Sequence, residues 1–318
     1  MTTFADGVFQ YGGAPVSGSF KTSKQFTIPN TAVGQGVSYP RGRTWFVDAS
    51  RTTTGNGKSP KLAFKTMQEA FNMLKSGDII YFVGKVTEQL VTPVQVFDVT
   101  VVGCGNRPRH ADSTPAGGAY AASQWGPPAS GGTAAQATVR VLQQGWRFVN
   151  ILWTAIDANA AMIEIVRNAG ADDAERDASH TEVLGCKFAG AGIGIKSGAT
   201  SFAENTTNCL VQGNTFLSNT YGMRQTTGFG GLNWQILDNV FISCTNDIVG
   251  PFTASKILRN SFSLAPTGAL ILTGAGLNMV HGNYMPGTYA AGTLYAPGTS
   301  DNWNGNFAST GVTAAVPA

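Results

Sequence analysis

Charged residues are scarce in this sequence. Only 12% of its 318 residues are Asp, Glu, Lys or Arg, and the formal net charge is +3. Lys and Arg form no run, so nucleic acid is not an expected partner. No segment approaches the length of a membrane-spanning helix, and the first residues lack the basic start and apolar stretch of a secretory signal. We therefore expect synthesis in a cytoplasm and no membrane contact.

Cysteine and histidine are too few and too scattered for most metal chemistry. The four cysteines contain no CxxC pair and share no metal-ligand spacing with the three histidines. Cys186, Cys209 and Cys244 lie in or beside apolar runs, which predicts buried free thiols, with a Cys186–Cys209 contact as the alternative. The histidines suggest no Ser/His/Asp arrangement. We expect neither a metal nor a cofactor.

A short phrase recurs four times in the second half of the chain and ends on a large apolar residue. Those residues are spaced 25, 21 and 23 apart. A weaker copy lies 28 residues earlier and puts Lys where the others have Asn. The copies are Gly213-Asn214-Thr215-Phe216, Asp238-Asn239-Val240-Phe241, Arg259-Asn260-Ser261-Phe262 and Gly282-Asn283-Tyr284-Met285, after Gly185-Cys186-Lys187-Phe188.

A period of this length is typical of a solenoid. Long amphipathic helices are missing from the region, and the Leu and Asn offsets are wrong for leucine-rich repeats, so a β-helix coil remains. Coils stack at strand spacing, roughly 4.8 Å, so a residue type that recurs once per coil forms a ladder. We predict an amide ladder and an inward ring ladder. Their members are Asn214, Asn239, Asn260 and Asn283, with Phe188, Phe216, Phe241 and Phe262; Asn150 is a candidate for the start of the amide ladder.

Residues 1–43 are predicted to form an extended arm, because Gly and Pro interrupt every apolar run there. The arm is nevertheless too apolar for a solvated linker. We expect it to lie either on its own barrel or on a partner, as the contact segment for a particle or an oligomer. Its contact residues would be Phe4, Val8, Phe9, Tyr11, Phe20 and Phe26.

The coils are expected over residues 44–285, and residues 286–318 are expected to form a tail that packs on the coils or on a neighbour. Thr66-Met67-Gln68-Glu69 has the pattern of a capping box, and apolar residues follow at helical spacing. This predicts a helix over 66–75 that covers the open end of the solenoid. Two insertions, at 105–135 around Trp125 and near 170–180, interrupt the coils.

The opening of the coil region resembles the right-handed parallel β-helix proteins of the pectin-lyase-like superfamily. The residues that carry this resemblance are Trp45-Phe46-Val47-Asp48, Ser59-Pro60, Ala63-Phe64-Lys65-Thr66, Gly77-Asp78-Ile79-Ile80 and Glu88. The arm that begins Met1-Thr2-Thr3-Phe4-Ala5-Asp6-Gly7 and the segment Gly103-Cys104-Gly105-Asn106-Arg107-Pro108 look like virion-associated β-helix proteins of tailed bacteriophages. The resemblance implies an all-β, right-handed parallel β-helix. The superfamily includes lyases, glycosidases, tailspikes and capsid-surface proteins, so the fold leaves the function open.

A glycosidase would need two carboxylates facing one groove. From residue 183 onward the only acidic residues are Glu204, Asp238, Asp247 and Asp301, and Asp238 is expected to serve a turn. The acidic run 172–177 lacks the spacing of a calcium loop and is expected to be a solvated turn. Lys187, Lys196 and Arg224 are candidate bases, and Trp125 and Trp146 are candidate sugar platforms, although a core position is the commoner fate of tryptophan. We expect no catalytic residues.

Two classes of function remain. The first is a non-enzymatic bacteriophage virion protein, a capsid decoration or cement protein that docks through its arm on the major capsid protein or another virion protein, as a homotrimer. The shortness of the chain favours this class over a tailspike. The second is a tailspike or depolymerase that binds or cleaves a host surface glycan. The expected location is the virion.

Overall fold

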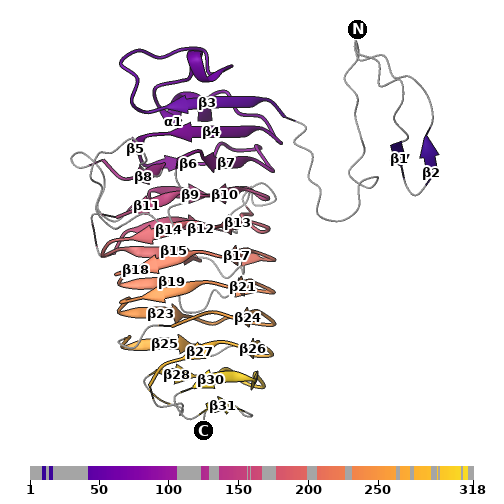
Figure 1. The fold of residues 1–318 in the computed structure, drawn as a ribbon, viewed down its shortest axis with the longest axis vertical. Helices are drawn as coiled ribbons and strands as arrows, with labels where there is room; N and C mark the ends of the chain where they lie inside the picture. Colours follow the sequence, from indigo (N-terminus) through magenta and orange to yellow (C-terminus); the bar gives the residue numbers. More distant parts are fainter. Residues whose placement is uncertain are drawn as a thin grey trace, which may run out of the picture.

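The computed structural model is a stack of coils along one axis, with the indigo N-terminal coils at one end and the yellow C-terminal coils at the other (Figure 1). The residues described are 9–11, 14–16, 42–105, 123–128, 136–155, 157, 159–166, 177–198, 206–225, 231–262, 266–272, 276–287, 292, 294–308 and 311–313. In these residues nearly all regular structure is β-strand, and the coil strands pair in parallel. The chain is a right-handed parallel β-helix, and the predicted fold class is confirmed.

Three long sheets form the faces of the solenoid. The ten-stranded sheet contains β3 (Thr44–Asp48), β4 (Ile79–Val83), β7 (Thr100–Gly103), β10 (Arg147–Val149), β13 (Glu182–Leu184), β17 (Leu210–Gln212), β21 (Gln235–Leu237), β24 (Lys256–Leu258), β26 (Met279–His281) and β29 (Asn302–Asn304). The eight-stranded sheet contains β6 (Leu90–Val91), β9 (Val139–Val141), β12 (Ala161–Ile165), β15 (Ile193–Ser197), β19 (Tyr221–Gln225), β23 (Asn246–Val249), β25 (Gly268–Ile271) and β28 (Tyr295–Ala296). The six-stranded sheet contains β5 (Lys85–Thr87), β8 (Gln124–Gly126), β11 (Leu152–Thr154), β14 (Lys187–Ala189), β18 (Thr215–Leu217) and β22 (Val240–Ile242).

Smaller elements complete the described structure. β16 (Thr206–Thr207) pairs with β20 (Gly231–Leu232), and β30 (Asn306–Ala308) pairs with β27 (Tyr284–Met285) and with β31 (Gly311–Thr313). Ser261 bridges the six-stranded sheet to β27. In the arm, β1 (Phe9–Tyr11) and β2 (Ala14–Val16) form an antiparallel pair. A short 3-10 helix, Pro60–Leu62, precedes α1 (Met67–Phe71).

Aromatic rings stack along the inside of the six-stranded sheet. Phe188, Phe216 and Phe241 are stacked with centroids 4.8 and 4.7 Å apart and nearly parallel planes, and Phe262 follows at 5.3 Å. Trp153 and Trp125 continue the stack toward the N-terminal end. The four predicted ring-ladder residues therefore share one core column. The centroid spacing matches the strand spacing, because each ring sits on the equivalent residue of its coil.

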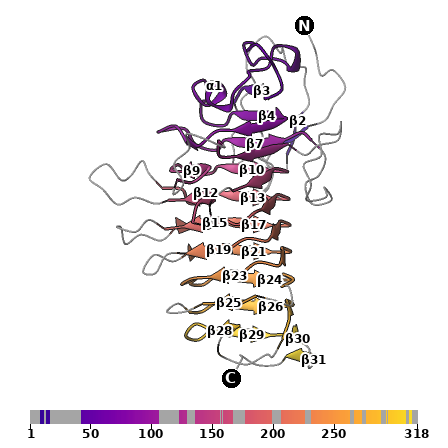
Figure 2. The ribbon, with the colours of Figure 1, turned by 90° about the vertical axis from the view of Figure 1, so that its left-hand side faces the viewer.

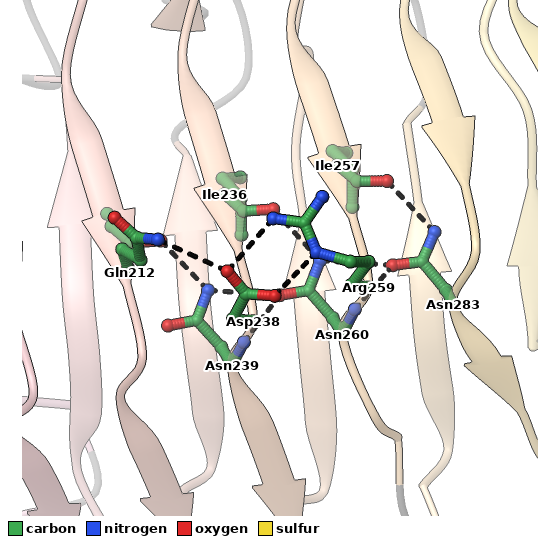
Figure 3. A network of polar contacts seen from close by, with 9 residues as sticks. Gln212, Ile236, Asp238, Asn239, Ile257, Arg259, Asn260 and Asn283 are labelled. Carbon is green, nitrogen blue, oxygen red and sulfur yellow. Dashed lines mark hydrogen bonds and ion pairs between the residues drawn. The ribbon is translucent and has the colours of Figure 1, made fainter.

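The amide ladder lies at the turn between the ten- and six-stranded sheets (Figure 3). Each Asn Oδ1 accepts two hydrogen bonds from the preceding Asn, one from its backbone N–H and one from Nδ2; for Asn214 and Asn239 they measure 2.9 and 3.0 Å. Nδ2 also donates to a carbonyl, as Asn239 does to Val211 at 2.9 Å. The chain of bonds runs through Asn214, Asn239, Asn260, Asn283 and Asn306.

Three details of the predicted ladder were wrong. The register pairs Lys187 with Thr215, so Cys186 occupies the Asn position, and its N–H donates to Asn214 Oδ1. Asn150 does not start the ladder: its φ of +57° places it in the turn, where its amide donates to the carbonyl of Gly103. Asn306 was missed because an Ala, not a large apolar residue, ends its copy of the phrase. The signal was there, since Gly305-Asn306 follows Gly282-Asn283 by 23 residues.

A second polar row, which the sequence reasoning also missed, lies at the turn that enters the ten-stranded sheet. The Trp234 N–H donates to Ser255 Oγ, the Ser255 N–H donates to Asn278 Oδ1, and Asn278 donates twice to Asp301 Oδ1 at 2.9 Å. Ser255, Asn278 and Asp301 recur every 23 residues, each five residues before a ladder Asn. Asp301 therefore serves the stack.

The capping box predicted for the helix is present. The Thr66 side chain accepts from the Glu69 N–H, and the Glu69 carboxylate accepts from the Thr66 N–H. Glu88, which follows β5, accepts from the N–H groups of Met67 and Gln68 at 2.8 Å, and this satisfies two more free donors of the first turn. The α-helix ends at Phe71, earlier than predicted, because the next turns close with bonds of the 3-10 type. Its role as a cap stays a prediction.

The coils extend further than the sequence reasoning placed them. β28 and β29 join the eight- and ten-stranded sheets, and β30 pairs with β27, so the expected end of the coils at residue 285 was too early. The predicted insertion at 105–135 also contains a coil strand, β8, whose Trp125 is buried. Both segments are hard to recognise in the sequence. They are rich in Gly and Ala, and each of their strands contributes only two or three residues to a sheet.

Candidate interaction surface

The outer face of the ten-stranded sheet carries a row of apolar side chains, one per coil. Register places them directly opposite one another on adjacent strands. We call this row the apolar column; its members are Phe46, Tyr81, Val102, Val149, Leu184, Leu237 and Leu258, with Gln212 between Leu184 and Leu237. All are partly exposed, because an outward side chain is covered only by its neighbours above and below. Phe46 and Tyr81 stack at 5.9 Å.

Polar groups flank the apolar column on both sides. On one side lies a mixed column two residues earlier on each strand, with an Arg147–Glu182 ion pair, exposed Gln235 and exposed Lys256. The Glu182 carboxylate raises the pKa of Arg147. On the other side lies the turn, where Asp238 accepts from Arg259 Nε at 2.7 Å (Figure 3). Asp238 has a φ of +57°, so it serves the turn as expected. The apolar column is thus one side chain wide except where Ile79, Val83 and Leu210 adjoin it.

A groove of about 410 Å³ opens at the N-terminal end of the apolar column. Phe46 and Tyr81 belong to the apolar column and also line the groove, together with Pro60, Val83 and Cys104. Cys104 is exposed, and partial burial raises the pKa of its thiol. The groove enlarges the apolar surface at the carboxyl ends of β3 and β4.

The eight-stranded sheet carries a contrasting outer row of charges. Register aligns Arg140, Glu164, Lys196 and Arg224 on adjacent strands. Glu164 lies 3.2 Å from Arg140 Nε and 2.8 Å from Lys196 Nζ. The Arg224 guanidinium lies over the Tyr221 ring, 4.6 Å from its centroid. This charged column holds three cations and one carboxylate, so it presents excess positive charge to solvent.

Most of the other candidate catalytic and sugar-binding residues have structural roles. Trp125 and Trp146 are core residues with no exposed surface, and Lys187 is buried. Asp247 is buried in the core, and burial raises its pKa to about 8. Glu204, and the acidic run apart from Asp177, lie outside the described residues. Within the described part, no three His, Cys, Asp or Glu side chains converge as metal ligands.

The buried cysteines are free thiols, as predicted. Burial raises the pKa of Cys186 to about 11 and those of Cys209 and Cys244 to about 12, so they stay protonated near neutral pH. Cys186 and Cys209 are not bonded to one another. Each thiol instead lies against backbone carbonyls, as Cys186 does against Phe148 at 3.6 Å.

Most of the predicted contact residues of the arm are not among the residues that the structure describes. Phe4, Val8, Phe20 and Phe26 lie outside the described residues, and for Phe9 and Tyr11 only the backbone of β1 is described. No helix of the described chain has the length and hydropathy to cross a membrane.

Comparison with known proteins gives likenesses of coil architecture. No protein-family model and no curated protein matches the sequence. A solved rhamnogalacturonan lyase is 9% identical, over 83% of this chain and 87% of that chain, with a TM-score of 0.38. A pectin methylesterase from Aspergillus niger is 16% identical, over 86% of this chain and 87% of its own, with a TM-score of 0.37. ORF18 of Geobacillus virus E2 is 14% identical, over 83% of this chain and 61% of ORF18, with a TM-score of 0.36.

The assignment of the fold rests on the strand pairing of this chain itself. Ten coil strands pair in parallel and in register in one sheet, and two further sheets close each coil. This chain is a parallel β-helix. The likenesses to the enzymes and the virus protein named above are at low identity and low TM-score, so neither their folds nor their activities are carried over.

Proposed function

We propose that the protein is a non-enzymatic structural protein of a bacteriophage particle, a capsid decoration protein that docks on the major capsid protein through its N-terminal arm. The observation that carries the proposal is the apolar column. An apolar row on an outer face, interrupted once by Gln212, is a surface for protein contact, whereas a sugar groove needs polar groups that orient the ligand. The apolar sequence of the arm and the resemblance to virion-associated β-helix proteins favour a phage particle as the assembly.

The test is the copy number of the protein in purified particles, measured by quantitative mass spectrometry against the major capsid protein. We expect one fixed ratio that corresponds to occupancy of most of the capsid surface lattice. A few copies per particle would indicate a tail spike or fibre instead. Absence of the protein from particles would contradict the proposal.

The charged column favours a second candidate function, binding of an acidic host surface polysaccharide by a tailspike-like protein. Arg140, Lys196 and Arg224 are spaced for repeated anionic groups along one chain, and Tyr221 offers an adjacent ring. Calorimetric titration with acidic and neutral capsular polysaccharides tests this candidate. Binding of the acidic polymer that weakens in Arg224→Ala, with Lys256→Ala on the ten-stranded sheet as control, would support it; no heat with either polymer would exclude it.

A further inference from the structure

We infer that Asn304 is a site of spontaneous deamidation in the folded protein, and that the fold protects Asn56 from the same reaction. Both residues precede a glycine, and the sequence contains this dipeptide only twice, at Asn56-Gly57 and Asn304-Gly305. A glycine nitrogen reaches the preceding side-chain amide with the least hindrance, because glycine has no Cβ. The two sites differ in the surroundings of that nitrogen.

The reaction needs only this chain and water. The backbone nitrogen of Gly305 loses its proton to solvent and attacks Cγ of Asn304. The Cγ–Nδ2 bond breaks, and the side-chain nitrogen leaves as ammonia. Water then opens one of the two C–N bonds of the cyclic imide. Opening at Cγ gives aspartate, and opening at the backbone carbonyl gives isoaspartate, in which the main chain runs through the side chain.

The Gly305 nitrogen is free because it follows β29, the terminal strand of the ten-stranded sheet (Figure 2). In earlier coils the nitrogen at this place in the turn donates to a carbonyl of the next coil, as Gly213 does to Leu237 at 3.0 Å and Arg259 to His281 at 3.0 Å. Among the described residues, the Gly305 N–H has no hydrogen-bond partner. Apart from its chain neighbours, no atom lies within 4 Å of the place that a Cβ on Gly305 would take.

The Asn304 side chain is also open to attack. It is partly exposed, and in the described structure it makes a single hydrogen bond, from Nδ2 to Oδ1 of exposed Asn302 at 3.2 Å. Register aligns Asn304 with His281 on the outer face of the ten-stranded sheet. Solvent therefore reaches the amide and can remove the ammonia.

The Gly57 nitrogen, in contrast, is held in place. Its N–H donates to the Leu62 carbonyl at 2.7 Å, and the Gly57 carbonyl accepts from the Phe46 N–H at 2.8 Å. Gly57 is buried, and a Cβ on it would lie 2.2 Å from a ring carbon of Phe64. Asn56 itself is exposed, so exposure of the amide does not protect it. The protection comes from the nitrogen, which must break a hydrogen bond and leave the Phe64 ring before it can react.

Isoaspartate at position 304 alters the end of the amide ladder. It adds one methylene to the backbone where the chain leaves β29, and Asn306 follows two residues later. The Asn306 Oδ1 accepts from the Asn283 N–H and Nδ2, both at 3.0 Å. These bonds depend on the register between the two coils, so a longer turn displaces the amide and loosens the last coil.

The test compares the two sites in the full-length wild type. The protein is kept at neutral pH for several weeks, with and without guanidinium chloride, and peptide mapping by mass spectrometry measures the fraction of each Asn converted. In the unfolded chain we expect similar rates at Asn56 and Asn304, since both precede glycine. In the folded protein we expect conversion at Asn304 to be at least about tenfold faster. Equal rates in the folded protein would overturn the inference, as would faster conversion at Asn56, or an Asn304 that persists while the unfolded chain converts.

Two variants separate the added charge from the added methylene. Asn304→Gln should stay unconverted at position 304, and Asn304→Asp carries the charge on an ordinary backbone. Hydrogen exchange of the Asn283 amide, measured by mass spectrometry, should be faster in the isoaspartate form of aged wild type than in fresh wild type or in Asn304→Asp. Unchanged exchange in the isoaspartate form would contradict the loss of the last ladder step.

Discussion

Asn239 shows how one side chain connects three coils. Its Oδ1 accepts from the Asn214 N–H and Nδ2, and its Nδ2 donates to the Val211 carbonyl and to Asn260 Oδ1. Asn239 is fully buried, so water cannot replace these partners. The amide therefore satisfies polar backbone groups that the turn would otherwise leave unpaired inside the solenoid.

Asn239→Leu is expected to lower the free energy of unfolding by about 3 kcal/mol or more, since it leaves several buried polar groups without partners. The control is Gln235→Leu, an exposed position four residues earlier, which should change stability by less than about 1 kcal/mol. Chemical denaturation of both variants measures the difference. Equal stabilities would show that the ladder bonds contribute no more than an average surface contact.

In contrast to Asn239, Asp247 has a buried side chain that lacks strong hydrogen bonds. Among the described residues, neither of its oxygens has a hydrogen-bond partner apart from the weak thiol of Cys244 nearby. Burial raises its pKa from 3.8 to about 8, because the charged form is poorly solvated in the core. Equivalent positions in neighbouring coils hold Gly222 and Ala269, which are uncharged.

The raised pKa of Asp247 predicts a stability that depends on pH. Between pH 3.8 and about 8 the folded state keeps a proton that the unfolded chain releases, so raising the pH favours unfolding across this window. Below pH 3.8 the Asp247 carboxyl is protonated in both the folded and the unfolded state, and above about pH 8 the loss of stability is complete. Asp247→Asn should flatten the decline and melt above the wild type at pH 9, while the two proteins converge near pH 4. If the melting temperatures of the wild type and Asp247→Asn changed in parallel between pH 4 and pH 9, the raised pKa of Asp247 would be contradicted.

At the scale of elements, the ring stack dictates residue size on the eight-stranded sheet. A Cβ on Gly222 would lie 2.7 Å from a ring carbon of Phe241 and 2.8 Å from the Asp247 carbonyl oxygen. On Gly194 it would lie 2.8 Å from Phe216. The rings lean across the core against β15 and β19, so only glycine fits there. Phe216 and Phe241 thus each require a glycine on the opposite sheet.

Gly222→Ala is therefore expected to destabilise the protein by about 2 kcal/mol through overpacking. Phe241→Leu alone should also destabilise, since it removes ring contacts with Phe216 and Phe262. In the double variant the smaller Leu gives room for the new methyl group. A double-mutant cycle should therefore show a favourable coupling of about 1 kcal/mol. Strict additivity would show that the backbone contact with Asp247 limits this site.

At the scale of the whole molecule, stability is local along the axis. Each coil contacts mainly its neighbours, so coil energies add approximately in series. The first coil strand, β3, begins at Thr44; its partner β4, and β7, which pairs with β4, come later in the chain. Figure 2 shows the same stack from a second side, with the coils aligned from β3 to β29. Within the arm, Gly42 and Arg43 hydrogen-bond to Gly77, Asp78 and Ile79 of the stack, and a deletion of residues 1–40 leaves both in place.

Deletion of residues 1–40 is accordingly expected to leave a folded β-helix that no longer attaches to particles. Circular dichroism should give a strand spectrum and a melting temperature within a few degrees of the full chain. Particle binding is measured by co-sedimentation with particles that lack the protein. A truncated protein that binds at full occupancy would show that the arm is not the attachment segment.

The repeat and several of its details could be predicted from the sequence. Spacings of 21 to 28 residues and the Asn and Phe phrases specified the coil, four members of each ladder and the turn at Asp238. It misplaced Cys186 and Asn150 and missed Asn306 and the row through Ser255. A ladder position is defined by register between coils, and a one-residue difference is visible only when the strands are paired.

What the sequence determined by itself is the coil, because a stacked amide and a stacked ring need only the same residue type at the same place in each turn. The tertiary structure decided which outer face is apolar. Members of the apolar column lie between 21 and 47 residues apart, a spacing too irregular to recognise as a repeat. Loops of different lengths separate them, and only pairing of the strands brings Phe46, Leu184 and Leu258 into one row.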